Sequence, residues 1–248
     1  MLIRSLERQG DWFFRWRSYV LLGFVPLGIV AILDPMPLRD WFGPAGVSVW
    51  RLFCVLLALA GLAFRAWTIG HVPARTSGRN AVRQVADALN TTGAYSVTRN
   101  PLYFGNAVTY VAVALFTQNL WFAAVMALFL VYYLERIIAA EERFLAGKFG
   151  AAWSDWAAGV PPFFPGFSAY VAPALPFSWK TVLKREYHGA LALATVLIAM
   201  VMATDFVATG GIVVRPLWIA AWVAAALFYG VMRYLKLRTT TLDVEGRG

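Results

Sequence analysis

Long apolar runs alternate with shorter polar stretches along most of the chain. A helix needs about 20 apolar residues to cross a hydrocarbon core of about 30 Å, and six runs come close to or exceed that length. The pattern predicts an all-α, polytopic membrane protein of about six transmembrane helices. The predicted spans are Ser18–Leu33, Val47–Ile69, Pro101–Thr117, Leu120–Ala140, His188–Val207 and Val214–Leu235.

The fourth run has a helical pattern that continues beyond the apolar residues, to about Phe149. Such a helix of about 30 residues is roughly 45 Å long at 1.5 Å per residue, which is longer than a bilayer core is thick. Its last turns, which carry Glu141 and Glu142, should therefore project into water. The chain before the first span, residues 1–17, is basic and amphipathic and predicts a short interfacial helix. Residues 34–37, Asp-Pro-Met-Pro, predict a turn.

Lysine and arginine are distributed asymmetrically between the two sides of these spans. One side receives the basic residues of segments 1–17, 75–99, 143–185 and 236–247. Because cytoplasmic loops are enriched in Lys and Arg, both termini and the polar segments 71–100 and 141–187 are expected on the cytoplasmic side. The segment 148–187 is rich in proline and aromatic residues, cannot span, and is expected to pack back onto the membrane face of the protein.

The composition agrees with a membrane protein. Hydrophobic residues make up 60% of the chain and charged residues 14%, with a mean hydropathy of +0.62, whereas soluble domains carry about 25% charged residues. The net charge of +9 would suggest nucleic acid as a partner of a soluble protein. Here the basic residues flank apolar runs, so they indicate membrane orientation and contact with anionic lipids, and we expect no nucleic-acid partner.

Metal and disulfide chemistry find little support. Cys54 is the single cysteine, so a disulfide or a cysteine metal site within one chain is excluded. His71 and His188 stand apart, with no ligand spacing around either. We therefore expect no metal site.

One stretch, residues 93–106, combines a polar glycine-containing loop with the start of an apolar helix. Pro101 suits the first helical position, where its missing N–H is not needed. Asn100 is then the natural N-cap, with its side chain accepting a bond from a free backbone N–H. A helix start of this kind carries partial positive charge and can hold a carboxylate or phosphate.

Carboxylates form the second candidate feature. Glu141 and Glu142 stand near a helix C-terminus, where negative charge opposes the helix dipole by about 0.3–1 kcal/mol each. Glu135 lies one or two turns earlier, within the membrane by this count, and an intramembrane ionisable residue is a functional candidate. The alternative is a solvated pair that ends a membrane helix. Arg136 either extends to the headgroups or anchors an acidic substrate group.

Taken together, an anionic group and a positive helix start on one face suit a zwitterion such as an amino-acid moiety. This predicts a cofactor site at the cytoplasmic face of the membrane. The residues themselves do not name the ligand.

The same stretches resemble the membrane methyltransferases of the isoprenylcysteine carboxyl methyltransferase and phospholipid methyltransferase group. The resemblance covers roughly residues 50–167. It rests on an ordered set of motifs rather than on any one of them. The motifs read Gly93-Ala94-Tyr95, Arg99-Asn100-Pro101-Leu102-Tyr103-Phe104-Gly105, Glu141-Glu142, Phe149-Gly150 and Val160-Pro161-Pro162-Phe163-Phe164-Pro165.

The resemblance implies S-adenosylmethionine as the methyl donor and a lipophilic or membrane-embedded acceptor, which could be a carboxylate, a thiol or a lipid amine. It implies that the loop and the following helix start hold the cofactor and that a glutamate of the pair binds its amino group. Arg136, with Glu135 beside it, falls near the position of the family's substrate arginine. The implied cofactor-binding residues are Gly93, Ala94, Tyr95, Arg99, Asn100, Pro101, Tyr103, Glu141 and Glu142.

Two departures from the family pattern are visible. Asn100 replaces a histidine, so it can donate a hydrogen bond but cannot carry charge. Trp153 and Trp156 stand where the family often has tyrosines.

Two other functions remain open at this stage. One is a membrane reductase of the steroid-reductase type, whose nicotinamide cofactor phosphate could meet Arg75, Arg79 and Arg83. The other is a helical lipid-binding scaffold without catalysis. We treat residues 1–248 as one membrane domain, with residues 188–237 as two helices outside the core. The composition suggests a bacterial inner membrane, whereas the acceptor and the oligomeric state do not follow from the sequence.

Overall fold

The computed structural model describes residues 2–17, 19–33, 38–74, 76 and 86–247. These residues form helices and connecting segments with no strands, which confirms the all-α prediction. The elements are α1 (Leu2–Trp16), a 3₁₀ turn η1 (Val20–Phe24), α2 (Val25–Leu33), α3 (Leu38–His71), α4 (Ala94–Val97), α5 (Pro101–Phe116), α6 (Leu120–Phe149), α7 (Ala151–Gly159), α8 (Trp179–Thr209) and α9 (Pro216–Arg238).

Four helices among the described residues are long and apolar enough to cross a membrane: α3 from Gly43 onward, α6, α8 and α9. A fifth is reached if Gln9–Trp16 and Val20–Leu33, bent by 84°, count as one span. α5 is apolar but has only 16 residues. The helices indicate a multi-pass membrane protein, while the number of six spans stays a prediction.

Helix ends differ from the predicted ends mainly where polar residues continue an apolar helix. α8 begins at Trp179, nine positions before the predicted His188, because Ser178 caps it by accepting a hydrogen bond from Thr181 N at 3.2 Å. Hydropathy marks the apolar length of a helix, whereas its full length depends on caps. α6 ends at Phe149 as predicted. The predicted turn at 34–37 lies outside the described residues.

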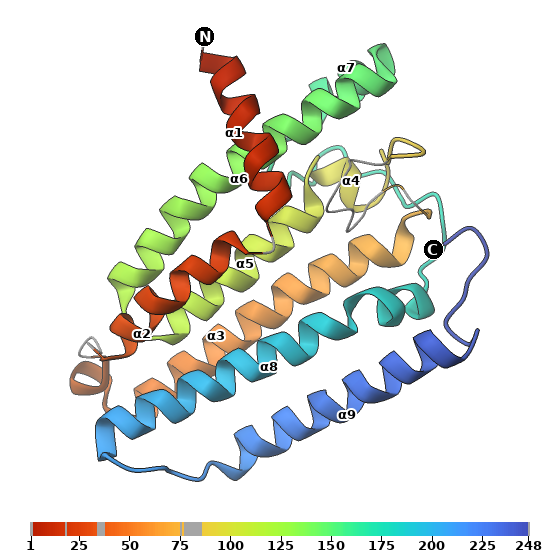
Figure 1. The fold of residues 1–248 in the computed structure, drawn as a ribbon. Helices are drawn as coiled ribbons and strands as arrows, with labels where there is room; N and C mark the ends of the chain where they lie inside the picture. The colour runs from red at the N-terminus through yellow and green to blue at the C-terminus, as the bar shows by residue number, and fades with distance from the viewer. Residues whose placement is uncertain (1, 18, 34–37, 75, 77–85, 248) are drawn as a thin grey trace.

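α5 occupies the centre of the core, between α3 and α6, while α8 and α9 continue the row beyond α3 (Figure 1). Two glycines allow α3 and α5 to lie very close. A Cβ on Gly61 would stand 2.6 Å from the Gly105 carbonyl oxygen, and one on Gly105 would stand 2.8 Å from that of Gly61. Small residues commonly permit such close packing of membrane helices.

A charged network joins α3, α5 and α8 beside this contact. The Arg65 guanidinium donates from Nε and Nη2 to the two Glu186 carboxylate oxygens, at 2.8 Å each. Its Nη1 donates to Asn106 Oδ1 at 2.9 Å and to the Leu102 carbonyl at 3.3 Å. Both charged side chains are only 13% exposed. The network ties the first turns of α5 to α3 and α8.

The N-terminal helix α1 crosses the second half of α6 (Figure 1). A Cβ on Gly10 would collide with the carbonyl of Arg136, so the backbones are in direct contact. Asp11 accepts two hydrogen bonds from Arg143 at 2.7 and 2.9 Å, and Phe13 packs edge-on against Tyr133. The helix predicted for residues 1–17 is therefore present, and its location at the membrane interface stays a prediction.

Glu186→Gln is expected to destabilise the protein by about 3–5 kcal/mol, because it leaves the buried Arg65 charge uncompensated. The measurement is thermal unfolding of the detergent-purified protein. Asp243→Asn is the control, since it removes the partner of Lys184 from a pair whose aspartate is 56% exposed, and it should cost about 0–1 kcal/mol. Equal unfolding of the two variants would contradict the assigned role of the network.

Candidate functional site

The loop before α5 turns at Gly93, which only glycine accommodates. Its φ of 61° and ψ of −128° lie where side chains are disfavoured, and a Cβ would stand 3.2 Å from Pro173 Cγ. Its N–H donates to the Val171 carbonyl at 2.9 Å. Ala94 is buried and Tyr95 is half-buried in the short helix α4 that follows. The predicted loop residues are thus fixed in place by the segment around 171–173.

α5 begins at Pro101 with Asn100 at the N-cap position, as predicted. The predicted cap itself is wrong, because the Asn100 side chain makes no hydrogen bond to the helix start. Its amide Nδ2 instead donates to the Pro162 carbonyl at 2.8 Å and lies 3.4 Å from Glu142 Oε1. The side chain is drawn away from the helix by acceptors on distant segments.

The segment 160–166, which we call the strap, crosses directly over the loop. This confirms for residues 160–166 that the polar–aromatic segment packs back onto the site. Four hydrogen bonds join strap and loop: Arg99 N to Pro161 O at 2.9 Å, Asn100 Nδ2 to Pro162 O at 2.8 Å, Thr98 Oγ1 to Phe163 O at 2.8 Å, and Gly166 N to Val97 O at 2.8 Å.

Glu142 meets the loop from the end of α6. Its Oε1 lies 3.2 Å from Arg99 Nε, and both side chains are mostly buried. The contact is an ion pair without hydrogen-bond geometry, since Arg99 Nε is a buried donor with no acceptor in the described part of the protein. The two halves of the predicted site therefore meet, at the residues Arg99, Asn100 and Glu142.

Glu141 engages α5 separately. Its carboxylate is hydrogen-bonded to the Tyr103 hydroxyl, and Arg17 is close enough to act on it electrostatically. Consecutive residues of a helix point about 100° apart, which explains why neighbouring glutamates contact different residues. The glutamate pair thus joins α6 to α5 at two points, Tyr103 and Asn100.

The Arg136 side chain contacts α1 and not the cluster of Arg99, Asn100 and Glu142. Its Nε donates to Gln9 Oε1 at 2.8 Å and its Nη1 to the Tyr132 carbonyl at 2.8 Å. The guanidinium carbon lies 3.4 Å from the centre of the Tyr132 ring. The structure does not bring Arg136 together with Asn100 and Glu142.

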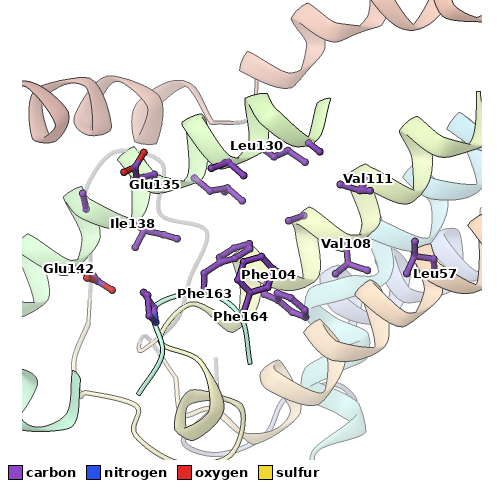
Figure 2. Close-up of a pocket in the computed structure, with 16 residues that line it drawn as sticks. Leu57, Phe104, Val108, Val111, Leu130, Glu135, Ile138, Glu142, Phe163 and Phe164 are labelled. Atoms are coloured by element: carbon purple, nitrogen blue, oxygen red, sulfur yellow. The ribbon is translucent and has the colours of Figure 1, made fainter. Parts of the chain in front are cut away.

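An apolar cavity of about 670 Å³ opens between α5 and α6, and the strap forms one of its walls (Figure 2). Glu142 lies at one end, and Glu135 lies at the rim with 63% of its side chain exposed. These two glutamates are the only charged residues among the lining side chains. The lining comprises Leu57, Phe104, Ala107, Val108, Val111, Ala127, Leu130, Val131, Leu134, Glu135, Ile138, Ala139, Glu142, Pro162, Phe163 and Phe164.

The sequence interpretation did not identify this cavity. The aromatic residues Phe104, Phe163 and Phe164 form an edge-to-face cluster in its wall. Their positions in the sequence belong to the motifs of the family resemblance, whereas their packing depends on how the strap folds back. A signal was present in the strap, because a Pro-Pro-Phe-Phe-Pro run is too apolar for a solvated linker.

Two further buried donors, both on α7, have no acceptor in the described residues. They are the indole Nε1 atoms of Trp153 and Trp156, both fully buried. The Trp153 ring centre lies 5.9 Å from the guanidinium carbon of Arg99. Within the described part of the chain, no group of three or more His, Cys, Asp or Glu side chains is arranged to hold a metal ion. Arg75, Arg79 and Arg83 lie outside the described residues.

Residues 45–152 match the family model for phospholipid methyltransferases. This match confirms the resemblance to the membrane methyltransferase group, and the matched region runs from α3 to the start of α7. It contains the loop, both glutamates and most of the cavity wall.

Two relatives are named as metal-resistance proteins. A nickel-cobalt-cadmium resistance protein of Alcaligenes xylosoxydans xylosoxydans is 27% identical over 163 residues, covering 56% of this chain and 74% of the relative. A cobalt-zinc-cadmium resistance protein of Cupriavidus metallidurans is 33% identical over 118 residues, covering 47% of this chain and about half, 52%, of the relative. No solved structure matches the chain significantly. These relatives do not favour the nicotinamide reductase.

Gly93→Ala is expected to destabilise the protein more than Gly150→Ala. Both glycines have nearly the same backbone angles, with φ of 61° and 53° and ψ of −128° and −127°. A Cβ at Gly93 also meets Pro173, whereas a Cβ at Gly150 meets no atom within 4 Å. Each change should cost about 1–2 kcal/mol for the backbone, with an additional loss at Gly93. Thermal unfolding of both variants tests this prediction. Equal losses of stability would show that the Pro173 side chain moves aside at no cost.

Proposed function

We propose that this chain, whose residues 45–152 match the phospholipid methyltransferase family model, is an S-adenosylmethionine-dependent methyltransferase that acts on a lipophilic acceptor held in the bilayer. The observation that carries the proposal is the position of Glu142. One side of this carboxylate faces the polar loop through Arg99 and Asn100, and it also lines an apolar cavity. A polar cofactor and an apolar substrate can meet there.

The residues present fit a zwitterionic cofactor. Glu142 supplies an anion for an ammonium group, while Arg99 supplies a cation whose buried Nε has no hydrogen-bond acceptor in the described residues. Gly93 has no side chain, so a cofactor could approach its backbone. Asn100 offers a side-chain amide as a hydrogen-bonding group. When bound, S-adenosylmethionine would supply an activated methyl group.

The protein's own contribution is alignment and exclusion of water. The cavity between α5 and α6 would hold the acceptor's apolar part, and its phenylalanines would keep water from the reacting end. Holding two reactants in line removes much of the entropic barrier to a displacement. Four hydrogen bonds join the strap to the loop. The strap would therefore fix the position of the cavity relative to the proposed cofactor site.

Among the acceptors that the family allows, the cavity supports a lipid amine. Glu135 and Glu142 would repel a carboxylate acceptor and attract an ammonium headgroup. Arg136, the expected anchor for an acidic group, donates to Gln9 and to the Tyr132 carbonyl. Its Nη1 also lies 3.4 Å from Glu135 Oε2, so its charge is already paired with a carboxylate. An amine must lose a proton before it attacks, and Glu135 at the cavity rim is the group we assign as base.

The remaining expectations fit the same proposal. The site would lie on the cytoplasmic side of a bacterial inner membrane, with both termini on that side, as the distribution of basic residues indicates. A reductase would require a nicotinamide cofactor in the same site, and a scaffold would require no cofactor. Binding measurements separate these three functions.

Native protein in detergent is expected to bind S-adenosylmethionine in a calorimeter, and Glu142→Gln should weaken binding roughly tenfold or more, since a charge-assisted contact contributes about 1.5–3 kcal/mol. Glu135→Gln is the matched control on the same helix and should keep the native cofactor affinity. Absence of binding by the native protein, with binding of a reduced nicotinamide cofactor, would establish the reductase instead. Absence of both would leave the scaffold.

With radiolabelled S-adenosylmethionine and mixed micelles, we expect the protein to methylate phosphatidylethanolamine. A fatty acid of equal chain length should not be methylated. Ala139→Phe, which fills the cavity, should raise the KM for the lipid without changing cofactor affinity. Ala124→Phe places the same bulk on an exposed position of α6 and should leave KM unchanged. Labelling of the fatty acid alone would contradict the assignment of an amine acceptor.

A further inference from the structure

Helix α7 presents one buried face in an otherwise exposed helix. Six of its nine residues are exposed, whereas Trp153, Trp156 and Ala157 turn inward. Residues three and four apart share one face of a helix, so the two indoles lie one above the other. Gly150, with its φ of 53°, sets this helix at an angle to α6, directly after the turns that carry Glu142.

Both indole N–H groups on that face are buried and meet no acceptor in the described residues. A buried tryptophan usually gives its N–H a hydrogen-bond partner, and a desolvated donor without one destabilises the fold. Such atoms are rare in folded proteins, so two on adjacent turns require an explanation. A bound ligand with acceptor atoms would pair both donors and so explain them.

The surroundings of Trp153 indicate where that ligand lies. Its ring centre is 5.9 Å from the guanidinium carbon of Arg99, and Arg99 Nε is itself a buried donor without a hydrogen-bond acceptor. Arg99 in turn lies 3.2 Å from Glu142. Arg99 and Trp153, each with an unpaired donor, therefore lie close to each other, and Arg99 also contacts Glu142. Trp156 follows Trp153 one turn later on the same face of α7. A ligand that pairs these donors must be rich in acceptors, and S-adenosylmethionine offers carboxylate, hydroxyl and ring-nitrogen atoms.

We infer that Trp153 and Trp156 are cofactor-binding residues, whose indole N–H groups donate hydrogen bonds to acceptor atoms of S-adenosylmethionine. The inference rests on the function proposed above and assigns α7 as a further wall of the same site. The indoles would then hold the cofactor's acceptors while Glu142 holds its ammonium group. Tyrosine at these positions could also donate, but from a shorter side chain and through a rotatable hydroxyl.

The test is calorimetric binding of S-adenosylhomocysteine, the demethylated product, which undergoes no turnover. Trp153→Phe and Trp156→Phe remove the N–H and keep an aromatic ring, and each is expected to weaken binding about tenfold. Trp121→Phe is the control, because this tryptophan is 75% exposed at the other end of α6, and it should bind as the native protein does. Native affinity in both test variants would overturn the inference.

Thermal unfolding without ligand separates binding from structure. Removing an unpaired buried donor relieves its desolvation cost, so the ligand-free variants should unfold within a few degrees of the native protein. Their stabilisation by S-adenosylhomocysteine should shrink. Variants that unfold early yet bind with native affinity would show that the indoles only pack, or that they bind a buried water.

Nuclear magnetic resonance of native protein labelled with ¹⁵N-tryptophan gives a readout that needs no variant. Indole N–H signals of two residues are expected to move downfield when S-adenosylhomocysteine is added. Binding without any such movement would overturn the inference while leaving the methyltransferase function intact. Failure of the native protein to bind the compound would instead overturn the proposed function, and this inference with it.

Discussion

A buried guanidinium must be neutralised where water is scarce, and Arg65 meets this requirement by joining three helices at one point. Its two bonds to Glu186 satisfy the charge, and its third nitrogen reaches Asn106 and the Leu102 carbonyl on α5. The start of α5 carries the loop that faces Glu142, so the orientation of the site depends on this network. α8 lies outside the region that matches the family model, yet through Glu186 it holds the core helices in place.

The candidate site is assembled from ends of elements. α5 contributes its beginning, α6 its last turns and the strap its carbonyl groups, while the loop around Gly93 contributes its backbone. Each of these groups lies at a helix terminus or in a connecting segment, where hydrogen-bonding atoms are not used by the helix itself. Beside them, the helix interiors of α5 and α6 offer mainly apolar side chains, with Glu135 as the exception, and form the cavity. Glu142 stands at the boundary between these two environments.

The N-terminal helix contacts a charged residue next to the cavity. Arg136 donates to Gln9 of α1 and lies 3.4 Å from the Glu135 carboxylate at the cavity rim, and it does not line the cavity itself. Charge inside an apolar cavity acts strongly, because the dielectric is low. The choice of acceptor under the proposed function thus depends also on a charge that lies outside the cavity wall.

The sequence alone determined the all-α class, the helix start at Pro101 and the length of α6. These features follow from hydropathy, proline geometry and the count of residues per turn, all of which are local. The direction of Arg136, the bonds of the Asn100 amide, the ion pair of Arg65 with Glu186 and the cavity itself were decided by tertiary structure. Each depends on a partner many residues away, as Gln9 is for Arg136 or Pro162 for Asn100, and a side chain turns toward whichever partner the packing of helices brings within reach.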